Sequence, residues 1–293
     1  MSRRPPSGPA RSGDSRARNA DLHCHSTASD GGLEPAALVQ RAAEQGVELL
    51  ALTDHDVLAG VAAARDAATR LGVPFVTGVE ISVTYAGRTV HVVGLGFRLD
   101  DEDLAKGLES VRGGRLGRAR AIAGELAAVG IEGAYEGALR HAGNPQLVSR
   151  THFARYLVES GVAPDVPRVF ERYLAEGKPG YVPQRWAGLP QAVGWIRAAG
   201  GVAVIAHPGR YRGGDTWLWS LCSDFRAAGG IAIEVVSSSH TADDVERFAQ
   251  VAREFGFEAS RGSDFHAPGE THAELGRAAP LPRDLVPVWH RFA

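Results

Sequence analysis

The most constraining feature of this sequence is the alternation of short apolar runs with longer alanine-rich stretches at helical spacing. This alternation is typical of a sheet whose strands are joined by crossover helices. The expected strands, rich in Val, Ile and Leu, are residues 20–23, 49–53, 75–80, 90–94, 202–206, 231–236 and 258–263. We therefore predict an α/β fold with about seven strands, in which residues 82–94 form a hairpin with a tight turn at residues 85–88.

The strand pattern stops between residues 99 and 199, where Ala, Leu, Arg and Glu recur at helical spacing. Helices are expected at residues 104–129, 134–141, 150–160 and 167–176. We expect residues 20–98 and 200–293 to form the sheet domain, with 99–199 as a helical insertion that caps the substrate site. The helix expected at 188–199 suits either part. Residues 1–19 contain almost nothing apolar and are expected to be a disordered leader.

Charge and cysteine content limit the partners and the compartment. The chain has 32 Lys and Arg against 34 Asp and Glu, for a net charge of −2, which argues against a generally basic nucleic-acid coat. No apolar stretch approaches the roughly 18 residues of a membrane span. Two cysteines form no disulfide framework and suit a reducing cytosol. We expect a cytoplasmic protein with no membrane or DNA-duplex partner and no obligate protein partner.

Six of the eleven histidines lie at or just after the carboxyl ends of expected strands, often beside carboxylates. Residues two apart in an extended chain point the same way, so His23 and His25 can bind one ion. In α/β barrels, groups at the carboxyl ends of different strands converge on one mouth. Imidazoles and carboxylates without thiolates favour Mn, Fe, Zn or Mg over a closed structural zinc site. The nine candidate ligands are His23, His25, Asp30, His55, Glu80, His91, His207, Asp264 and His266.

Nine candidates are too many for one ion, but they suffice for three if one carboxylate bridges, and Glu80 is central in the set. Paired ions about 3.5–4 Å apart activate water and stabilise a leaving oxygen, so the implied reaction is phosphoester hydrolysis by a metal-bridging hydroxide. His207 and Asp264 are the candidate catalytic residues, and either His207 or a metal-bound water protonates the leaving alcohol.

Arginine is the expected phosphate ligand because its planar guanidinium matches phosphate oxygens. Arg150 and Arg210 are the main candidates for substrate binding, and Ser149 and Lys178 are secondary candidates. Asp54 and Asp56 flank His55; we expect them to orient imidazoles, with helix capping as the alternative for Asp56.

Four motifs, at residues 21–26, 53–55, 206–208 and 262–266, resemble those of the PHP (polymerase and histidinol phosphatase) family. The resemblance covers about residues 20–98 and 200–275. It implies a distorted seven-stranded (β/α)7 barrel with a trinuclear metal site. By this resemblance, the first ion is held by His23, His25, Glu80 and Asp264, the second by Asp30, His55 and His266, and the third by Glu80, His91 and His207.

The helical insertion, with residues 148–153, 177–179 and 206–211, is similar to stand-alone bacterial PHP enzymes acting on nucleotides. That subgroup includes 3′,5′-nucleoside bisphosphate phosphatases and 5′-3′ exoribonucleases. The resemblance implies phosphomonoester hydrolysis of a nucleoside 3′,5′-bisphosphate or a 5′-mononucleotide, with two or three divalent ions. Mn²⁺ is the first choice, and Fe²⁺, Zn²⁺ and Mg²⁺ are alternatives. The other hypotheses are an exoribonuclease on short 5′-phosphorylated RNA, a histidinol phosphatase-like enzyme and a non-catalytic regulatory module. The even charge balance favours a small or short substrate.

Overall fold

The computed structural model describes residues 18–292, so most of the expected leader, residues 1–17, lies outside it. Seven strands follow one another around a nearly closed barrel in the order β1-β2-β3-β4-β6-β7-β8. Their bounds are β1 (Ala20–Asp21), β2 (Leu49–Leu52), β3 (Phe75–Tyr85), β4 (Arg88–Leu95), β6 (Val202–Ile205), β7 (Ala232–Ser237) and β8 (Glu258–Gly262). The barrel closes beyond β1, where the Leu22 N–H donates to the Arg261 carbonyl at 3.0 Å. The predicted α/β fold with a distorted seven-stranded barrel is confirmed.

One strand gives the barrel its distortion. Within the described residues, β4 runs antiparallel to both of its neighbours, β3 and β6, whereas the other pairs in the barrel path are parallel. The β3–β4 turn has φ of 46° at Ala86 and 77° at Gly87, as a two-residue hairpin turn requires. A two-residue strand that the sequence pattern did not predict, β5 (Ala187–Gly188), pairs with β3 outside the barrel path.

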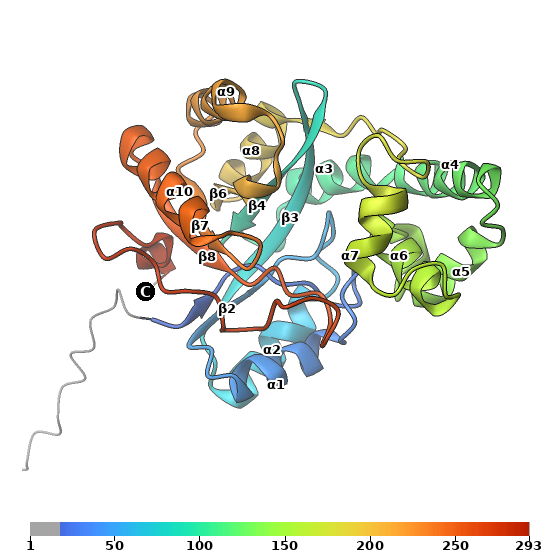
Figure 1. Ribbon diagram of the computed structural model, residues 1–293. Helices are drawn as coiled ribbons and strands as arrows, with labels where there is room; N and C mark the ends of the chain where they lie inside the picture. Colours follow the sequence, from blue (N-terminus) through green and yellow to red (C-terminus); the bar gives the residue numbers. More distant parts are fainter. Residues whose placement is uncertain (1–17, 293) are drawn as a thin grey trace, which may run out of the picture.

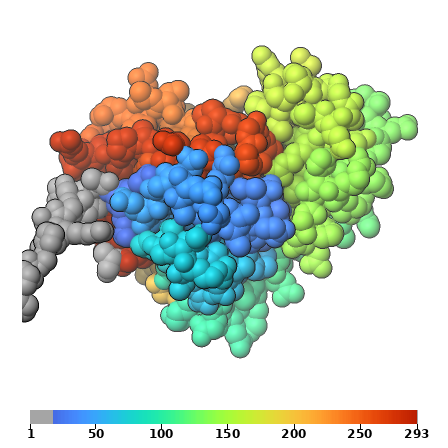
Figure 2. All heavy atoms as spheres, turned by 90° about the horizontal axis from the view of Figure 1, so that it is seen from below, coloured from blue at the N-terminus to red at the C-terminus, as the bar shows by residue number. Residues whose placement is uncertain are grey.

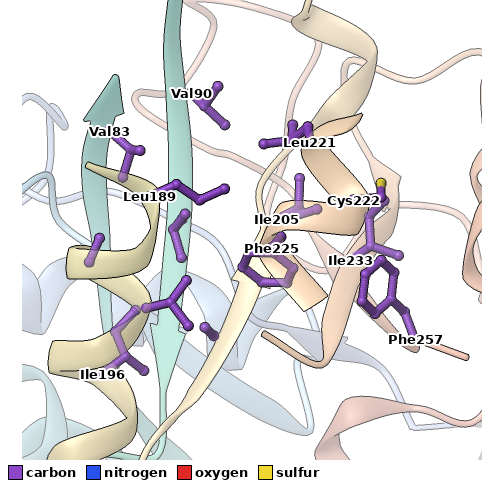
Figure 3. Packing of buried hydrophobic residues seen from close by; sticks show 14 of the residues in the cluster. Val83, Val90, Leu189, Ile196, Ile205, Leu221, Cys222, Phe225, Ile233 and Phe257 are labelled. Atoms are coloured by element: carbon purple, nitrogen blue, oxygen red, sulfur yellow. The ribbon is translucent and has the colours of Figure 1, made fainter. Parts of the chain in front are cut away.

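Amphipathic helices cover the outside of the barrel (Figure 1). They are α1 (Pro35–Glu44), α2 (Val61–Leu71), α8 (Leu189–Ala198), α9 (Gly214–Ala227) and α10 (Ala242–Phe255). Figure 3 shows Leu189 of α8 beside the β3–β4 hairpin, and Phe225 of α9 near Ile233 of β7, all within one buried cluster. Each fully buried side chain of this size stabilises the fold by about 1.5–3 kcal/mol. No helix in residues 18–292 combines the length and apolarity needed to cross a bilayer.

The helical insertion has a hydrophobic cluster of its own, which includes Ile122, Phe153 and Leu174. Its helices are α4 (Arg115–Ala128), α5 (Ala134–His141), α6 (Arg150–Glu159), α7 (Val166–Val169) and the short η2 (Pro145–Leu147) and η3 (Phe170–Leu174). Figure 1 shows α4 to α7 grouped on one side of the barrel, and Figure 2 shows these segments, in green and yellow, as a lobe.

Three expectations about these segments and the leader need correction. The single helix expected at 104–129 is two, α3 (Glu102–Arg112) and α4, because the chain bends at the poor helix formers Gly113 and Gly114. Leu104 and Leu108 of α3 belong to the barrel cluster, although the 99–199 boundary assigned this helix to the insertion. The helix α8, which either part could have held, contributes to the barrel cluster as well. The expected leader is also too long, because Asn19 donates from its backbone N–H to Glu48 Oε2 at 2.7 Å.

Candidate metal and phosphate site

The structure brings the nine predicted metal ligands together at one end of the barrel. His23 and His25 follow β1, His55 follows β2, Glu80 lies in β3, His91 in β4, His207 follows β6, and Asp264 and His266 follow β8. The remaining ligand, Asp30, lies on a loop that Asp54 fixes. The Asp54 carboxylate accepts hydrogen bonds from the Ser26 N–H at 2.8 Å and from the Ser26 and Ser29 hydroxyls, each at 2.6 Å.

Glu80 is the central carboxylate of this cluster. Its Oε1 atom lies 2.8 Å from Nδ1 of His91 and 2.9 Å from Nε2 of His207. Its Oε2 atom lies 2.9 Å from Nδ1 of His55 and 3.3 Å from Nε2 of His23. Because its two oxygens face different histidines, this carboxylate has the placement that a bridging ligand needs.

Two further carboxylates face the same histidines. Asp264 Oδ1 lies 3.2 Å from His25 Nε2 and 3.5 Å from His23 Nε2, and Asp30 Oδ1 lies 3.5 Å from His266 Nε2. The donor atoms form four overlapping groups, each with its atoms within 4.8 Å of one another: His25, Asp30, His55 and His266; His23, Glu80 and His207; His23, His25 and Asp264; and His55, Glu80 and His91.

The unpaired atoms of this cluster test whether it suits metal ions. His23 Nε2, both ring nitrogens of His25 and Glu80 Oε2 are buried without a hydrogen-bond partner in the described part of the chain. A buried polar atom left unpaired costs about 1–3 kcal/mol. Imidazole nitrogens and carboxylate oxygens are ligands for divalent cations, which would satisfy these atoms. The donor set therefore fits divalent metal ions.

The electrostatics of the cluster keep two of its donors, Glu80 and His25, in the protonation states that metal binding requires. Burial alone would raise the pKa of Glu80, but the imidazoles of His91, His55 and His23 outweigh it and hold that pKa well below its usual range. Burial and the neighbouring imidazoles lower the pKa of His25 to about 3. The carboxylate is therefore ionised and this imidazole neutral near pH 7.

Glu234 of β7 is a site residue that sequence reasoning missed. Its buried carboxylate uses both oxygens, with Oε1 2.6 Å from Nδ1 of His23 and Oε2 accepting the backbone N–H of His207 at 2.5 Å. This contact turns the opposite ring nitrogen of His23 toward Glu80. An acidic residue inside an otherwise apolar strand pattern was the available signal.

The two aspartates beside His55 make no hydrogen bond or ion pair with an imidazole in residues 18–292, contrary to expectation. Asp54 instead fixes the Asp30 loop. Asp56 accepts hydrogen bonds from the backbone N–H and the hydroxyl of Ser82 at 2.7 and 2.9 Å, and forms a buried ion pair with Arg115. These carboxylates hold the loops and the insertion in place around the metal ligands.

The four predicted substrate residues have different surroundings. The Ser149 hydroxyl donates to Asp30 Oδ2 at 2.9 Å and also caps α6. Arg150 and Arg210 line the cavity above the metal cluster, where Arg210 also forms an ion pair with Asp264. Lys178 is exposed and does not line that cavity. The structure therefore brings both arginines and Ser149 to the site but leaves Lys178 outside it.

Arg118 of α4 is a second residue that sequence reasoning missed. It lines the same cavity, of about 140 Å³, and stacks on Trp186 at 5.4 Å. Its Nε atom donates to the Val182 carbonyl at 2.9 Å, but it has no carboxylate partner within residues 18–292. Burial, with Arg150 and Arg115 nearby, lowers the pKa of Arg118 to about 9. A cation in these surroundings is stabilised by an anion in the cavity.

Comparison with known proteins agrees with this architecture. Residues 21–160 match the PHP domain family model. A 3′,5′-nucleoside bisphosphate phosphatase from Chromobacterium violaceum is 53% identical over 94% of this chain and 96% of its own length. A 5′-3′ exoribonuclease from Haemophilus influenzae is 44% identical over 93% of this chain and 98% of its own length.

Similarity extends to three-dimensional structure. The structure of an amidohydrolase from Chromobacterium violaceum, with bound sulfate and no metal, superposes with a TM-score of 0.91. It is 53% identical to this chain, and the match covers 93% of this chain and 95% of that one. Identity of this extent along nearly the whole length of each relative confirms the resemblance seen in the four motifs. The chain belongs to the PHP domain family.

Proposed function

We propose that this chain is a metal-dependent phosphoesterase that hydrolyses phosphomonoesters of small nucleotides. The proposed substrate is a nucleoside 3′,5′-bisphosphate or a 5′-mononucleotide. The observation that carries the proposal is one cavity that combines the metal donor cluster with Arg118 and Arg150. Neither arginine has a carboxylate partner within residues 18–292. The bisphosphate phosphatase named among the relatives supports this substrate class.

Each of the nine proposed ligands has a place in a three-ion arrangement. We assign His23, His25, Glu80 and Asp264 to one ion, Asp30, His55 and His266 to a second, and Glu80, His91 and His207 to a third. Bound divalent cations, with Mn²⁺ as the first choice and Fe²⁺, Zn²⁺ or Mg²⁺ as alternatives, supply Lewis-acid stabilisation of phosphoryl oxygens and a nucleophile at neutral pH.

The chain's own residues orient the phosphate and assist the metal site. Arg118 and Arg150 present guanidinium groups to the cavity, which suits phosphate oxygens. Burial and the nearby Arg210 lower the pKa of His207 to about 4, so the imidazole stays neutral and suits a ligand better than a proton donor. Asp264 has a double role, because Oδ1 faces the histidines while Oδ2 pairs with Arg210.

Exoribonuclease activity on short 5′-phosphorylated RNA is the second candidate function. The cavity above the metals shares walls with two larger cavities, of about 270 and 390 Å³, so a substrate longer than one nucleotide has room on either side. The relative from Haemophilus influenzae supports this activity. We also propose a cytoplasmic location, which suits the free buried thiols of Cys24 and Cys222.

A phosphate-release screen with Mn²⁺ tests the proposed function. The substrates are adenosine 3′,5′-bisphosphate, 5′-AMP, histidinol phosphate and a 5′-phosphorylated RNA oligomer. We expect turnover of the nucleotides, and loss of that turnover in His55→Ala and Asp264→Ala. His141→Ala is the matched control, because His141 pairs with Glu159 on the insertion, outside the metal cluster. Activity confined to histidinol phosphate would reject the substrate class.

A further inference from the structure

The loop that carries Asp30, residues 26–33, is held by contacts from both the barrel and the helical insertion. On the barrel side, hydrogen bonds to Asp54 fix this loop. On the insertion side, Gly143 packs against Thr27 so closely that a Cβ atom at Gly143 would lie 2.5 Å from the Thr27 carbonyl oxygen. Both parts of the molecule therefore set the position of Asp30, one of the nine proposed metal ligands.

Ser149, at the start of α6 in the insertion, determines how the Asp30 carboxylate is turned. Its hydroxyl oxygen accepts the Thr151 N–H at 3.1 Å, and its single hydroxyl proton is donated to Asp30 Oδ2 at 2.9 Å. The other carboxylate oxygen, Oδ1, faces Nε2 of His266 at 3.5 Å and Nε2 of His55 at 3.8 Å. These two histidines and Asp30 are the ligands assigned above to the second ion, so a residue of the insertion orients a ligand of that ion.

Ser149 is itself held in place by the insertion. Its backbone N–H donates to Nδ1 of the buried His152 at 3.0 Å, which completes the capping box of α6. Within residues 18–292, Ser149 is the only residue of the insertion that hydrogen-bonds to a proposed metal ligand. Arg115 and Arg155 also join the insertion to the barrel, but through carboxylates outside the nine proposed ligands. The link between the insertion and the metal cluster therefore depends on one hydroxyl group.

We propose that Ser149 is a positioning residue through which docking of the insertion and binding of the second ion stabilise each other. While the insertion is docked, Ser149 keeps Asp30 Oδ1 turned toward the ion. Because coupling between two binding events is reciprocal, the ion stabilises the docked insertion by the same factor. Metal loading is thereby linked to closure of the cavity that Arg118 and Arg150 line. This inference rests on the metal site of the proposed function and deepens it by describing how that site is regulated.

Calorimetric titration of the metal-stripped full-length protein with Mn²⁺ tests one direction of this coupling. Ser149→Gly removes the hydroxyl but leaves a residue that helix N-caps accept at little cost. We expect it to weaken one class of Mn²⁺ site about tenfold or more and to leave the others within about twofold. Ser149→Thr keeps the hydroxyl, and its extended backbone, with φ of −107° and ψ of 172°, suits threonine, so affinity should stay within about threefold of the wild type.

The matched control for this titration is Ser160→Ala. The Ser160 hydroxyl lies at the opposite end of α6 and donates to the Tyr156 carbonyl at 2.8 Å, away from the metal cluster. Its removal should leave every Mn²⁺ affinity unchanged, and circular dichroism establishes that all the variants fold. Unchanged Mn²⁺ binding in folded Ser149→Gly would overturn the proposal.

Amide hydrogen exchange in α6, measured with and without saturating Mn²⁺, tests the reverse direction. In the wild type, Mn²⁺ should slow exchange at the start of α6 about tenfold, the factor by which Ser149→Gly weakens the ion. In Ser149→Gly, Mn²⁺ should change this exchange by less than about twofold. A purely structural helix cap would instead alter exchange equally with and without Mn²⁺, and that result would overturn the coupling.

Failure of the coupling and failure of the proposed function give different results. If the wild type binds Mn²⁺ and releases phosphate from nucleotides, but Ser149→Gly changes neither Mn²⁺ affinity nor the Mn²⁺ effect on exchange, only the coupling is rejected. If the wild type shows the coupling but turns over no nucleotide, the proposed function fails and the coupling stands. A wild-type protein that binds no Mn²⁺ would overturn both.

Discussion

Replacing Glu234 by glutamine tests how the metal ligands are oriented. The Glu234 side chain is 1% exposed, and its two oxygens contact His23 Nδ1 at 2.6 Å and the His207 N–H at 2.5 Å. Glutamine keeps the shape but has one acceptor oxygen and one NH₂ group. Whichever way the amide turns, it cannot accept at both positions. Its NH₂ group faces either the His207 N–H, where two donors clash, or His23 Nδ1, where it can donate only if the imidazole proton lies on Nε2, the nitrogen that faces Glu80.

The expected effect of Glu234→Gln is a loss of metal affinity. Burial lowers the pKa of His23, but the carboxylates of Glu234, Glu80 and Asp264 outweigh it and raise that pKa well above its usual value. Removing the Glu234 charge therefore makes this imidazole a poorer base and a poorer ligand. Partners that orient metal ligands contribute about 10–100-fold to metal affinity or activity, so we expect a loss in that range.

Calorimetric titration of the metal-stripped protein with Mn²⁺ near neutral pH measures this loss. Glu258→Gln is the matched control, because Glu258 lies on the neighbouring strand β8 and pairs with Arg291 at 2.7 Å, with the arginine 48% exposed. Circular dichroism establishes that both variants fold. The proposed orienting role is refuted if folded Glu234→Gln binds Mn²⁺ within about twofold of the wild type.

Three further predictions concern the arginine cavity, the insertion and acid stability. Arg118→Ala should raise KM for the preferred nucleotide about tenfold. Steady-state kinetics measure this KM, and Arg120→Ala, which removes an exposed arginine on the same helix, is the control. Arg155→Ala should lower the free energy of unfolding by about 2 kcal/mol in urea denaturation, because its contacts to Glu270 at 3.0 and 2.8 Å tie α6 to the segment after β8. Burial lowers the pKa of His152 from 6.5 to about 4, so the unfolded chain binds the extra proton between these values. The free energy of unfolding should therefore fall as the pH is lowered from 6.5 to about 4. The fall should be larger in the wild type than in His152→Gln, by on the order of 3 kcal/mol. If urea denaturation shows that the free energy of unfolding falls equally in both proteins over this pH range, the prediction is contradicted.

The strand positions and the carboxyl-end ligands were predictable because local pattern determines both. An apolar run that stops at a histidine or carboxylate marks a strand end, and the barrel then brings distant strand ends together. The positions of His207 and Asp264, just after β6 and β8, follow from this rule, whereas Glu80 lies inside β3 and not at its expected end. Asp54 and Asp56 show its limit, because the sequence places them beside His55 but does not indicate where their carboxylates point.

Residues whose role depends on tertiary packing were missed. Arg118 is one of many arginines, and nothing near it in sequence shows that α4 turns it toward the metal cluster. Glu234 lies within a strand, so its contact with His23 depends on the neighbour order of the barrel. Lys178 illustrates the reverse, since its glycine- and proline-rich surroundings indicated a site loop, yet its side chain is exposed away from the cavity.

Phosphate release measured against the number of Mn²⁺ ions bound per chain tests the central claim most directly. Metal-stripped protein is titrated with Mn²⁺, and bound metal and turnover of adenosine 3′,5′-bisphosphate are measured on the same samples. The nine-ligand cluster predicts no turnover in the stripped protein and full turnover at two or three ions per chain. Turnover that survives complete metal removal, or full turnover in a Glu80→Ala variant that binds no metal, would contradict a metal-dependent phosphoesterase centred on Glu80.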